Sequence, residues 1–553
     1  MPKKAYISLT SHIGMSPREK KRNLEQDILE GERVSRREAL STAGKVAVSA
    51  IVAGVVAGVG GYLAGSAAVP PPKTVTETVA GKTVTVTAPA KTVTTTVTGP
   101  APPAKTVTAT VTSTATAPAA PAEIAATAWA VGPDPPSEYR YKNFEIAAER
   151  LNKMLGTMGI TTRIKVSGQF FVRPVEWEEY RKKFYLAFKA GEAPDIYLTG
   201  HEDVGYLAEN NYIIPLDDYI KEYEDTTYYD IIPTLWDACK YKGKTWAVPQ
   251  DTEVRPLYFR KDVLRKLGWS EDEIEEFPEK IRRAEITLDD ILEIAKEAVD
   301  KGLVKRGLVH RVKEGYDYLQ FYLGYGGRLW DPAAGKMVFS KKAWEKTLDW
   351  FYRAVYEYKV ILPTQFSGDW DKDFHEPATK GTTLFISGGS WHKGEWVKKG
   401  LLSEDEFWKV MGYALHPAGE PGRSPVTLSH PLIYTVTTQA KDRGKADIAA
   451  MLITLVTDPH LNSIHAVEST HLAILYSEIS DSRYTKDKFL HDVAYMLDYT
   501  NFIPSHPKWS DYSRTVFTVL RAVETGDMKP DMAYDTLLSE LQKALGDALK
   551  VED

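Results

Sequence analysis

The chain has little cysteine and no charge excess that would favour a polyanionic partner. Cys239 is the only cysteine in 553 residues, which excludes an intramolecular disulfide framework, and we expect a buried, inert thiol. The formal net charge of -6 and a pI of about 6.1 provide no broad basic field for nucleic-acid phosphates. Nucleic acid is therefore not expected as a partner.

Motifs for common enzyme chemistries are also missing. The histidines are scattered without HExxH or other metal-ligand spacing, and there is no G-x-S-x-G, Walker or dinucleotide-binding motif. We therefore expect no metal and no cofactor. At this length the chain exceeds what one hydrophobic core usually serves, so two or more packed units plus some unstructured sequence are expected.

The N-terminal region looks like a delivery signal. The run Ser35-Arg36-Arg37-Glu38-Ala39-Leu40 resembles a twin-arginine export signal, and it precedes an uncharged stretch from Val46 to Ala68. That stretch is long enough to span a bilayer, so residues 46–68 are expected to be a cleaved signal or a transmembrane anchor rather than a buried core helix. The positive-inside rule places residues 1–45 in the cytoplasm and the remainder outside, either tethered to the membrane or secreted. No cysteine follows that would carry a lipid.

Residues 69–122 consist almost wholly of Thr, Val, Ala and Pro. Alternating Thr and Val is compatible with a β-strand, since both are β-branched. Repeated prolines and the lack of large apolar side chains instead favour a flexible, disordered stalk, because little surface can be buried to offset the ordering entropy. O-glycosylation of the stalk is a compositional hypothesis.

From Glu123 onward the sequence is aromatic-rich and charged, and apolar runs alternate with amphipathic helical patterns. This predicts an α/β fold with helices covering a mostly parallel sheet. The first expected elements are a strand at Glu123–Val131, a helix at Tyr141–Gly156, a strand at Thr161–Ser167, a helix at Glu176–Ala190 and a strand at Pro194–Leu198. Ligands of such sheets lie beyond the carboxyl ends of strands, which is where His201 and Glu202 follow.

Five sequence fragments then occur in order along this part. They are Ala193–Ile196; Gly243–Pro249 with Leu257–Asp262; Glu314–Tyr316 with Tyr325–Gly327; Lys380–Trp391; and Ile503–Pro504 with Gly526–Ala533. Together they resemble the solute-binding proteins of sugar ABC importers, of the maltose-binding-protein type. Arg260 stands where that pattern has Asn.

The resemblance implies a two-lobe periplasmic-binding-protein fold of type II, whose lobes close on a small molecule by hinge motion. We expect residues 123–249 with 365–422 to form the first lobe and residues 250–364 with 423–553 the second. It further implies a receptor, not an enzyme, with a monomeric globular part that delivers its ligand to the permease of an ABC importer.

A sugar presents C–H faces to aromatic rings and hydroxyl groups to carboxylates. By motif position, the resemblance implies ligand contacts from His201, Glu202, Glu253, Glu314, Tyr316, Trp391, Trp509 and Tyr512. Trp391 follows a Gly-Gly-Ser turn, which favours stacking on a ligand over core packing. Tyr316 and Trp509 are equally compatible with packing, and Arg255 is positioned to neutralise Glu253. Trp344, Trp350 and Phe351 fit the inner face of a helix at Lys341–Tyr358 and are expected in the core.

Two other functions remain open at this point. A secreted glycoside hydrolase also uses carboxylates and tryptophans in a cleft. A structural cell-surface protein would use the stalk as a spacer and bind no small molecule. Aromatic abundance favours a sugar or oligosaccharide, although proteins of this fold also carry polyamines, peptides and metal complexes.

Overall fold

The computed structural model describes residues 75–79, 82–86 and 123–553. The chain divides into two units, Met1–Thr114 and Ala115–Asp553, which are described separately. The predicted cytoplasmic segment 1–45 and the predicted signal or transmembrane segment 46–68 lie outside the described residues. Within the described ranges, no helix combines the length and the apolar character needed to cross a membrane.

In the first unit, two strands lie in the segment predicted to be an unstructured stalk. Strands β1 (Val75–Val79) and β2 (Lys82–Val86) pair antiparallel, with Val75 opposite Val86. Threonine and valine favour extended backbone, and neither strand contains proline. The prediction of disorder is therefore wrong for these two strands, because β-branched alternation prevails where proline is absent.

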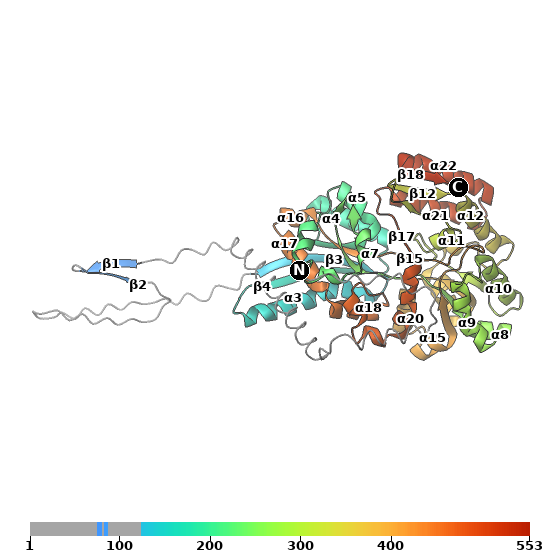
Figure 1. Cartoon of the computed structure of the whole chain (residues 1–553), viewed down its shortest axis with the longest axis horizontal. Coiled ribbons are helices and arrows are strands. Elements are labelled where there is room, and N and C mark those ends of the chain that lie inside the picture. Colours follow the sequence, from blue (N-terminus) through green and yellow to red (C-terminus); the bar gives the residue numbers. More distant parts are fainter. Residues whose placement is uncertain (1–74, 80–81, 87–122) are drawn as a thin grey trace, which may run out of the picture. The chain divides into compact units, whose positions relative to one another are not determined.

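The first lobe of the second unit is built on a five-stranded sheet in the order β4-β3-β5-β16-β8, of which β3 and β4 are labelled in Figure 1. Its strands are β3 (Glu123–Gly132), β4 (Arg163–Val172), β5 (Ile196–Gly200), β8 (Val248–Asp251) and β16 (Leu432–Val436). β3 runs parallel to β4 and β5, whereas β16 is antiparallel to β5 and β8. The expected α/β pattern is confirmed, with the three strands β5, β8 and β16 fully buried.

The second lobe contains a four-stranded sheet in the order β10-β13-β9-β14. Its strands are β9 (Leu257–Arg260), β10 (Arg306–Val309), β13 (Thr383–Ser387) and β14 (Met411–Ala414). β13 pairs with both β10 and β9, and β14 pairs with β9. Our assignment of residues 365–422 to the first lobe is therefore wrong, and so is the placement of β16 in the second lobe. The pairing partners of these strands lie far away in sequence, as Arg306 does from Thr383 and Gly200 from Leu432, so local patterns could not reveal them.

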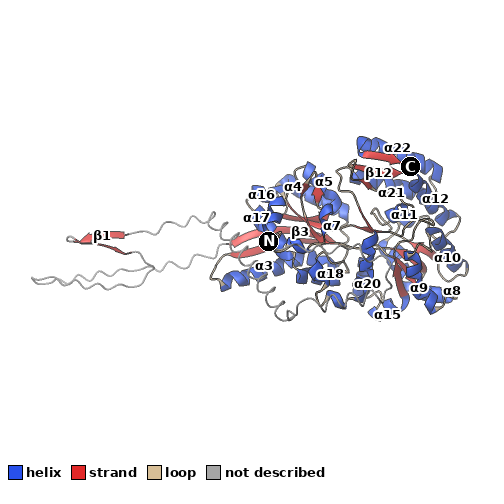
Figure 2. Ribbon diagram, in the orientation of Figure 1, coloured by secondary structure: helices blue, strands red, loops and turns tan. Residues whose placement is uncertain are grey.

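Helices cover both sheets, which lie in the interior of each lobe (Figure 2). Around the first sheet lie α3 (Tyr139–Thr157), α4 (Trp177–Ala190), α5 (Val204–Glu209), α6 (Asp217–Glu222), α7 (Pro233–Ala238), α16 (Thr438–Asp442), α17 (Ala446–Val456) and α18 (Pro459–Ser469). The remainder are α8 (Lys261–Leu267), α9 (Glu271–Arg282), α10 (Leu288–Asp300), α11 (Leu319–Gly324), α12 (Lys341–Tyr356), α13 (Glu376–Lys380), α14 (Trp391–Lys398), α15 (Glu404–Val410), α19 (Tyr476–Ile479), α20 (Lys488–Val493), α21 (Trp509–Thr525) and α22 (Pro530–Leu545).

Local sequence determines where several of these helices begin and end. α9, α10 and α15 each start with a capping box, in which Ser270, Thr287 or Ser403 exchanges hydrogen bonds with the acidic residue three positions later. α4 ends at Gly191, whose φ of 80° is a left-handed conformation that glycine adopts without strain. These signals explain why helix positions were predictable from sequence.

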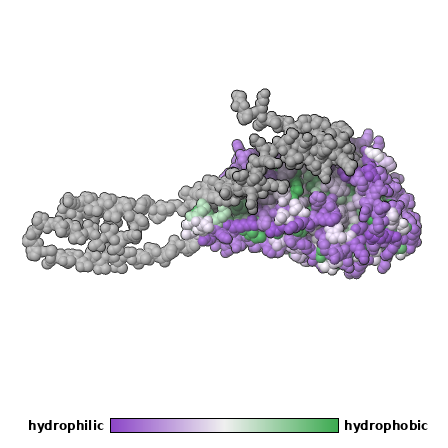
Figure 3. Space-filling view, turned by 60° about the horizontal axis from the view of Figure 1, so that its bottom comes forward, coloured by the Kyte–Doolittle hydropathy of each residue, from purple (hydrophilic) through white to green (hydrophobic). Residues whose placement is uncertain are grey.

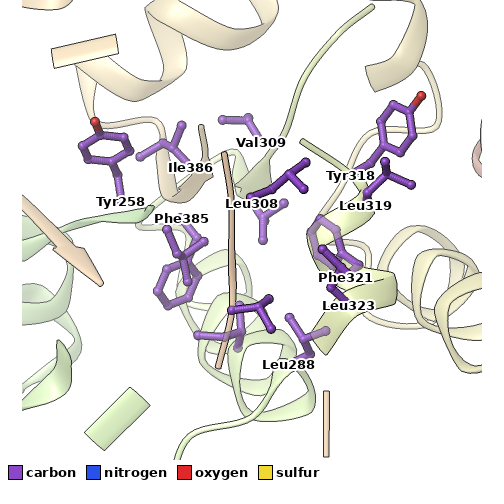
Figure 4. Close-up of a cluster of buried hydrophobic side chains, with 14 of the residues drawn as sticks. Tyr258, Leu288, Leu308, Val309, Tyr318, Leu319, Phe321, Leu323, Phe385 and Ile386 are labelled. Carbon is purple, nitrogen blue, oxygen red and sulfur yellow. The ribbon is translucent and has the colours of Figure 1, made fainter. Parts of the chain in front are cut away.

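The second lobe holds the larger hydrophobic core, part of which is shown in Figure 4. In that view Leu308 and Val309 of β10 lie between side chains of β13 and of α11. Trp344, Trp350 and Phe351 of α12 are completely buried, as predicted from helical spacing. Cys239 is also buried, as expected, and burial raises the pKa of its thiol.

Three segments carry the chain between the lobes: the residues after β8, those between β14 and β16, and those after α18. β15 (Thr427–Ser429) and β17 (Thr500–Phe502) pair in parallel beside the second crossing. Smaller pairings are β6 (Lys240–Tyr241) with β7 (Lys244–Thr245), and β11 (Trp330–Asp331) with β12 (Lys336–Ser340) and β18 (Leu549–Glu552). The face of the molecule visible in Figure 3 is largely hydrophilic, with small scattered apolar patches.

Candidate functional site

A cleft of about 560 Å³ lies between the two lobes. Its size falls within the range of small-molecule sites. It sits at the carboxyl ends of the strands β3, β4, β5 and β8 of one sheet and of β10 and β13 of the other, as expected for α/β ligand sites. Its walls include Val131, Gly132, Pro133, Arg140, Arg173, Val175, Glu176, Trp177, Glu178, Arg181, Glu202, Glu253, Arg255, Arg311, Lys313, Glu314, Gly315, Tyr316, Phe366, Ser367, Trp370, Trp391, His430, Leu432, His471, Ser510, Ser513, Arg514, Phe517 and Arg521.

Glu202 is the centre of a charged group at the end of β5. Its Oε1 accepts hydrogen bonds from Arg181 Nη2 and from Tyr316 Oη, the latter at 3.0 Å, while its Oε2 lies 2.5 Å from His430 Nε2. Burial alone would raise the pKa of Glu202, but His430 and Arg181 hold it well below its usual range. Because Tyr316 belongs to the second lobe, this carboxylate joins the two lobes.

His201, the neighbour of Glu202, does not line the cleft. Its ring is completely buried, with Nδ1 3.2 Å from the Pro431 carbonyl and Nε2 2.8 Å from the Ile503 carbonyl. Burial lowers its pKa to about 4, so the ring is neutral at pH 7 and only one nitrogen donates at a time. The prediction that His201 contacts a ligand is wrong for this conformation, because the backbone turns after Gly200 and directs the ring inward.

The last residue of β8 and the crossing that follows it contribute two carboxylates of different character. Asp251 accepts from Arg140 Nε at 3.0 Å and from Nη2 at 2.8 Å, and it lies 2.8 Å from His465 Nε2. Burial opposes ionisation of Asp251, yet Arg140 and the neighbouring His471 hold its pKa well below the usual range. For Glu253 burial prevails over the Arg255 guanidinium 2.8 Å away, and its pKa rises to about 7. Arg255 does pair with Glu253, as its sequence position indicated.

The second lobe supplies Glu314, Tyr316 and Trp391. Trp391 begins α14 and is half-buried, and the guanidinium of Arg255 lies 5.3 Å from its ring centroid. The ring of His471 lies 6.3 Å from that of Trp391 at an interplanar angle of 17°. Thus Glu202, Glu253, Glu314, Tyr316 and Trp391 share one cleft, as their selection from the sequence implied.

Trp509 and Tyr512 lie instead in the core of the second lobe. They are 1% and 0% exposed, and their rings stack 5.1 Å apart. Trp509 and Tyr512 lie on one face of α21. The other face presents Ser510, Ser513, Arg514, Phe517 and Arg521 to the cleft at helical spacing. The prediction of ligand contacts from Trp509 and Tyr512 is wrong because the rotation of α21, set by packing, turns them inward.

Several cleft residues were missed. The arginines 140, 173, 181 and 311 line the cleft, as do Trp177, Trp370 and His430. Arg173 and Trp177 follow β4 directly, so the carboxyl-end rule could have found them. Trp370 and His430 carry no comparable local signal, because distant segments bring them to the cleft.

Two groups of side chains have donor atoms within 4.8 Å of one another and could be considered for a metal: His201, Glu202 and His430, and Asp251, His465 and His471. In the second group Arg140 already donates twice to Asp251, and in the first Arg181 and Tyr316 occupy Glu202. A guanidinium bound to the same carboxylate repels a cation, so ion pairing accounts for both groups.

Comparison with known proteins gives a consistent result. Residues 162–459 match the family model described as bacterial extracellular solute-binding protein. A maltotriose-binding protein of Pyrococcus abyssi (strain GE5 / Orsay) is 20% identical over 349 residues, covering 62% of this chain and 69% of that protein.

Two solved structures share the fold. The maltose-bound MalE3 of T. maritima superposes with a TM-score of 0.61 at 18% identity, covering 77% of this chain and 100% of that one. An ABC transporter solute-binding protein of Thermotoga lettingae TMO, bound with α-D-tagatose, superposes with a TM-score of 0.61 at 19% identity. The match covers 76% of this chain and 100% of that one. The predicted two-lobe periplasmic-binding-protein fold is thereby confirmed.

Proposed function

This chain belongs to the family of bacterial extracellular solute-binding proteins, and from that premise we propose that it captures a carbohydrate outside the cytoplasm by closure of its two lobes. The proposal further assigns delivery of the ligand to an ABC importer permease. The cleft between the lobes is the observation that carries it, because ligand-binding side chains from both lobes face one space. The sugar ligands named for these two structural relatives support a carbohydrate, and the description of the Thermotoga lettingae protein as an ABC transporter solute-binding protein supports the permease as partner.

Contacts that cross the cleft support a closing mechanism. Tyr316 of the second lobe donates to Glu202 of the first, and Arg173 Nη2 of the first lobe lies 3.0 Å from Glu395 Oε1 of the second. These contacts require the lobes to be close together, so they are made on closure and broken on opening. A ligand that touches both walls favours the closed conformation.

The N-terminal region supplies the cellular setting in this proposal. The twin-arginine-like run followed by the apolar stretch 46–68 would export the chain and either anchor it or be cleaved. Residues 69–122 would then separate the receptor from the membrane. The size of the N-terminal fragment retained on the mature protein, measured by intact mass, distinguishes an anchor from a cleaved signal.

The decisive test is binding without turnover. The full chain is titrated calorimetrically with mono-, di- and trisaccharides, and the products are analysed for released reducing ends. We expect one ligand per chain, a raised melting temperature and no hydrolysis. Released sugars would instead indicate a glycoside hydrolase, and no binding across the panel would contradict carbohydrate capture.

Trp391 allows a matched comparison of variants. If its ring contacts the sugar, Trp391→Ala should weaken binding by about 1 kcal/mol. Trp408 on α15 lies outside the cleft and its indole donates to Glu404, so Trp408→Ala should leave affinity unchanged. Equal affinities for all three proteins would remove Trp391 from the ligand contacts.

A further inference from the structure

Three arginines, one from each lobe and one from the first crossing, converge on one side of the cleft and form an arginine wall. Arg173 follows β4, Arg255 lies in the first crossing, and Arg311 follows β10. The guanidinium carbons of Arg173 and Arg311 lie 5.0 and 5.1 Å from the ring centroid of Trp370. Arg255 lies over Trp391, the other tryptophan of this wall. Cation–π contact therefore holds all three guanidiniums beside the ligand space.

Two of the carboxylates that balance these arginines lie behind the wall, whereas Glu253, which also pairs with Arg255, lines the cleft. Asp317 is 1% exposed and accepts Arg255 Nε at Oδ1 and Arg311 Nη1 at Oδ2. Glu395 is 0% exposed and pairs with Arg173. Neither Asp317 nor Glu395 lines the cleft. In these pairs the guanidinium groups thus face the ligand space, and the carboxylates of Asp317 and Glu395 face the core.

Each arginine keeps donors that no protein group uses. Within residues 123–553, Arg255 Nη2 and Arg311 Nη2 have no hydrogen-bond partner, and Arg173 pairs with Glu395 through Nη2 alone. These nitrogens are not among the buried atoms that lack a partner, so they reach accessible space. The arginines therefore offer preorganised N–H groups to whatever fills the cleft.

Of the three cleft carboxylates expected to accept sugar hydroxyls, two, Glu202 and Glu253, are engaged by the protein. Glu202 accepts from Arg181, Tyr316 and His430, and Glu253 Oε1 accepts from the His430 backbone N–H and pairs with Arg255. The cleft consequently offers more free donors than free acceptors on this wall. A ligand rich in acceptor oxygens matches it better than one that must donate.

From this arrangement we propose that the ligand is an acidic carbohydrate whose anionic group binds against Arg173, Arg255 and Arg311. The chemistry recognised is a sugar carboxylate or sulfate ester, since both present paired oxygens to planar guanidiniums. This inference rests on the proposed function and specifies its substrate class.

Two matched pairs of disaccharides test the proposal in the full chain. One pair is α-1,4-digalacturonate with α-1,4-galactobiose, and the other is neocarrabiose 4-sulfate with neocarrabiose. Calorimetric titration at low salt should give at least about tenfold tighter binding of the acidic member in one pair, which identifies carboxylate or sulfate as the recognised group. The preference should shrink as NaCl is raised, because salt screens the added attraction.

Variants then test the arginines. Arg311→Gln leaves Asp317 paired with Arg255, so it exposes no unpaired buried carboxylate, and it should reduce the preference for the acidic sugar by about tenfold. Arg311→Lys keeps the charge but not the planar guanidinium fork. Its preference for the acidic sugar should lie between those of the unmodified chain and of Arg311→Gln. Arg150→Gln removes a positive charge from α3 outside the cleft and should leave the preference intact. Thermal unfolding verifies that each variant is folded.

The outcomes separate the two proposals. Neutral disaccharides that bind as tightly as their acidic counterparts in both pairs would overturn the acidic-ligand inference and leave carbohydrate capture standing. An acidic preference that survives Arg311→Gln undiminished would also overturn it. Absence of binding to every sugar, neutral or acidic, would overturn the proposed function and the inference with it.

Discussion

Arginine–carboxylate pairs occur in two regions of this molecule that differ in how the partners are held. In the first lobe, Asp251 binds Arg140 and His465 in a network whose members are nearly inaccessible to solvent. Across the cleft, Arg173 pairs with Glu395 and Arg514 lies 4.0 Å from Glu178, joining one lobe to the other. All members of the first network belong to one lobe, whereas the second group joins the two lobes. Under the proposed closing motion, the same chemistry would therefore stabilise the fold in one region and the closed conformation in the other.

Asp251→Asn should produce the largest effect, and it falls on folding. The substitution leaves the buried Arg140 guanidinium without its counter-ion, which costs about 3–5 kcal/mol of the free energy of unfolding. Urea unfolding of the full chain measures it. Asp262→Asn, which breaks a bidentate but partly exposed pair with Arg260, should cost less. Equal losses in the two variants would remove the distinction based on burial.

Tyr316→Phe should act on closure and not on folding. It removes a hydrogen bond to the ionised Glu202 across the cleft, which is worth about 1.5–3 kcal/mol. The affinity for the ligand should therefore fall about tenfold or more. Calorimetry measures the affinity, and small-angle scattering follows the closing.

Tyr413→Phe is the matched control for that variant. Tyr413 donates to Asp492 at 2.7 Å, and both residues belong to the second lobe. Its loss should lower stability and leave affinity unchanged. If Tyr413→Phe weakened binding as much as Tyr316→Phe, the hydrogen bond across the cleft would have no special role in closure.

Glu253 sharpens the comparison because it lies where the two regions meet, facing Arg255, His430 and Asp251. Its pKa is raised from 4.5 to about 7 by burial. Between these values the unfolded chain ionises Glu253 first, so stability falls as pH rises from about 4.5 to 7 and this loss is complete above pH 7. Glu253→Gln should remove this part of the slope in urea unfolding midpoints.

Glu478 supplies the internal reference for that experiment. Burial raises the pKa of Glu478 to about 8. Its contribution to the free energy of unfolding therefore falls over a wider pH range that extends to higher pH. The Glu253→Gln variant should therefore retain a slope between pH 7 and 8. A slope between pH 4.5 and 7 identical to that of the unmodified chain would contradict the raised pKa of Glu253.

Glu178→Gln should have the smallest effect. Glu178 and Arg514 are 63% and 59% exposed, so water and salt screen their interaction. We expect the free energy of unfolding to change by less than about 0.5 kcal/mol, and the salt dependence of ligand association to be slightly reduced. A larger loss of affinity would show that the rim of the cleft contributes more than its exposure implies.

Many elements of the fold followed from local sequence. The strand predicted at Glu123–Val131 and the helix predicted at Lys341–Tyr358 are present as β3 and α12, with boundaries shifted by one or two residues. Periodicity and capping residues operate over a few positions, so one sequence suffices to read them. Ordered fragments along the chain also indicated the family that comparison then confirmed.

The candidate site was only partly predictable. Glu202 and Glu253 lie in turns that follow strands, where the carboxyl-end rule applies. Trp509 and Tyr512 failed because a single helix carries both core and cleft faces, and only packing against the second lobe sets its rotation. The arginines of the wall, Arg173 and Arg311, are ordinary charged residues in sequence, and their convergence on Trp370 depends on long-range folding.

By itself, the sequence determined the α/β class, the position of most helices, the burial of Cys239 and the family, because these depend on composition, short-range periodicity and ordered motifs. The tertiary structure alone decided that β13 and β14 belong to the second lobe, that Trp509 faces the core and that carboxylates lie behind the arginines of the cleft. Many of these contacts join residues that lie far apart in sequence, such as Gly412 with Phe259 and Arg173 with Glu395. The free energy of such long-range contacts is set by packing and burial, which a local sequence pattern does not indicate.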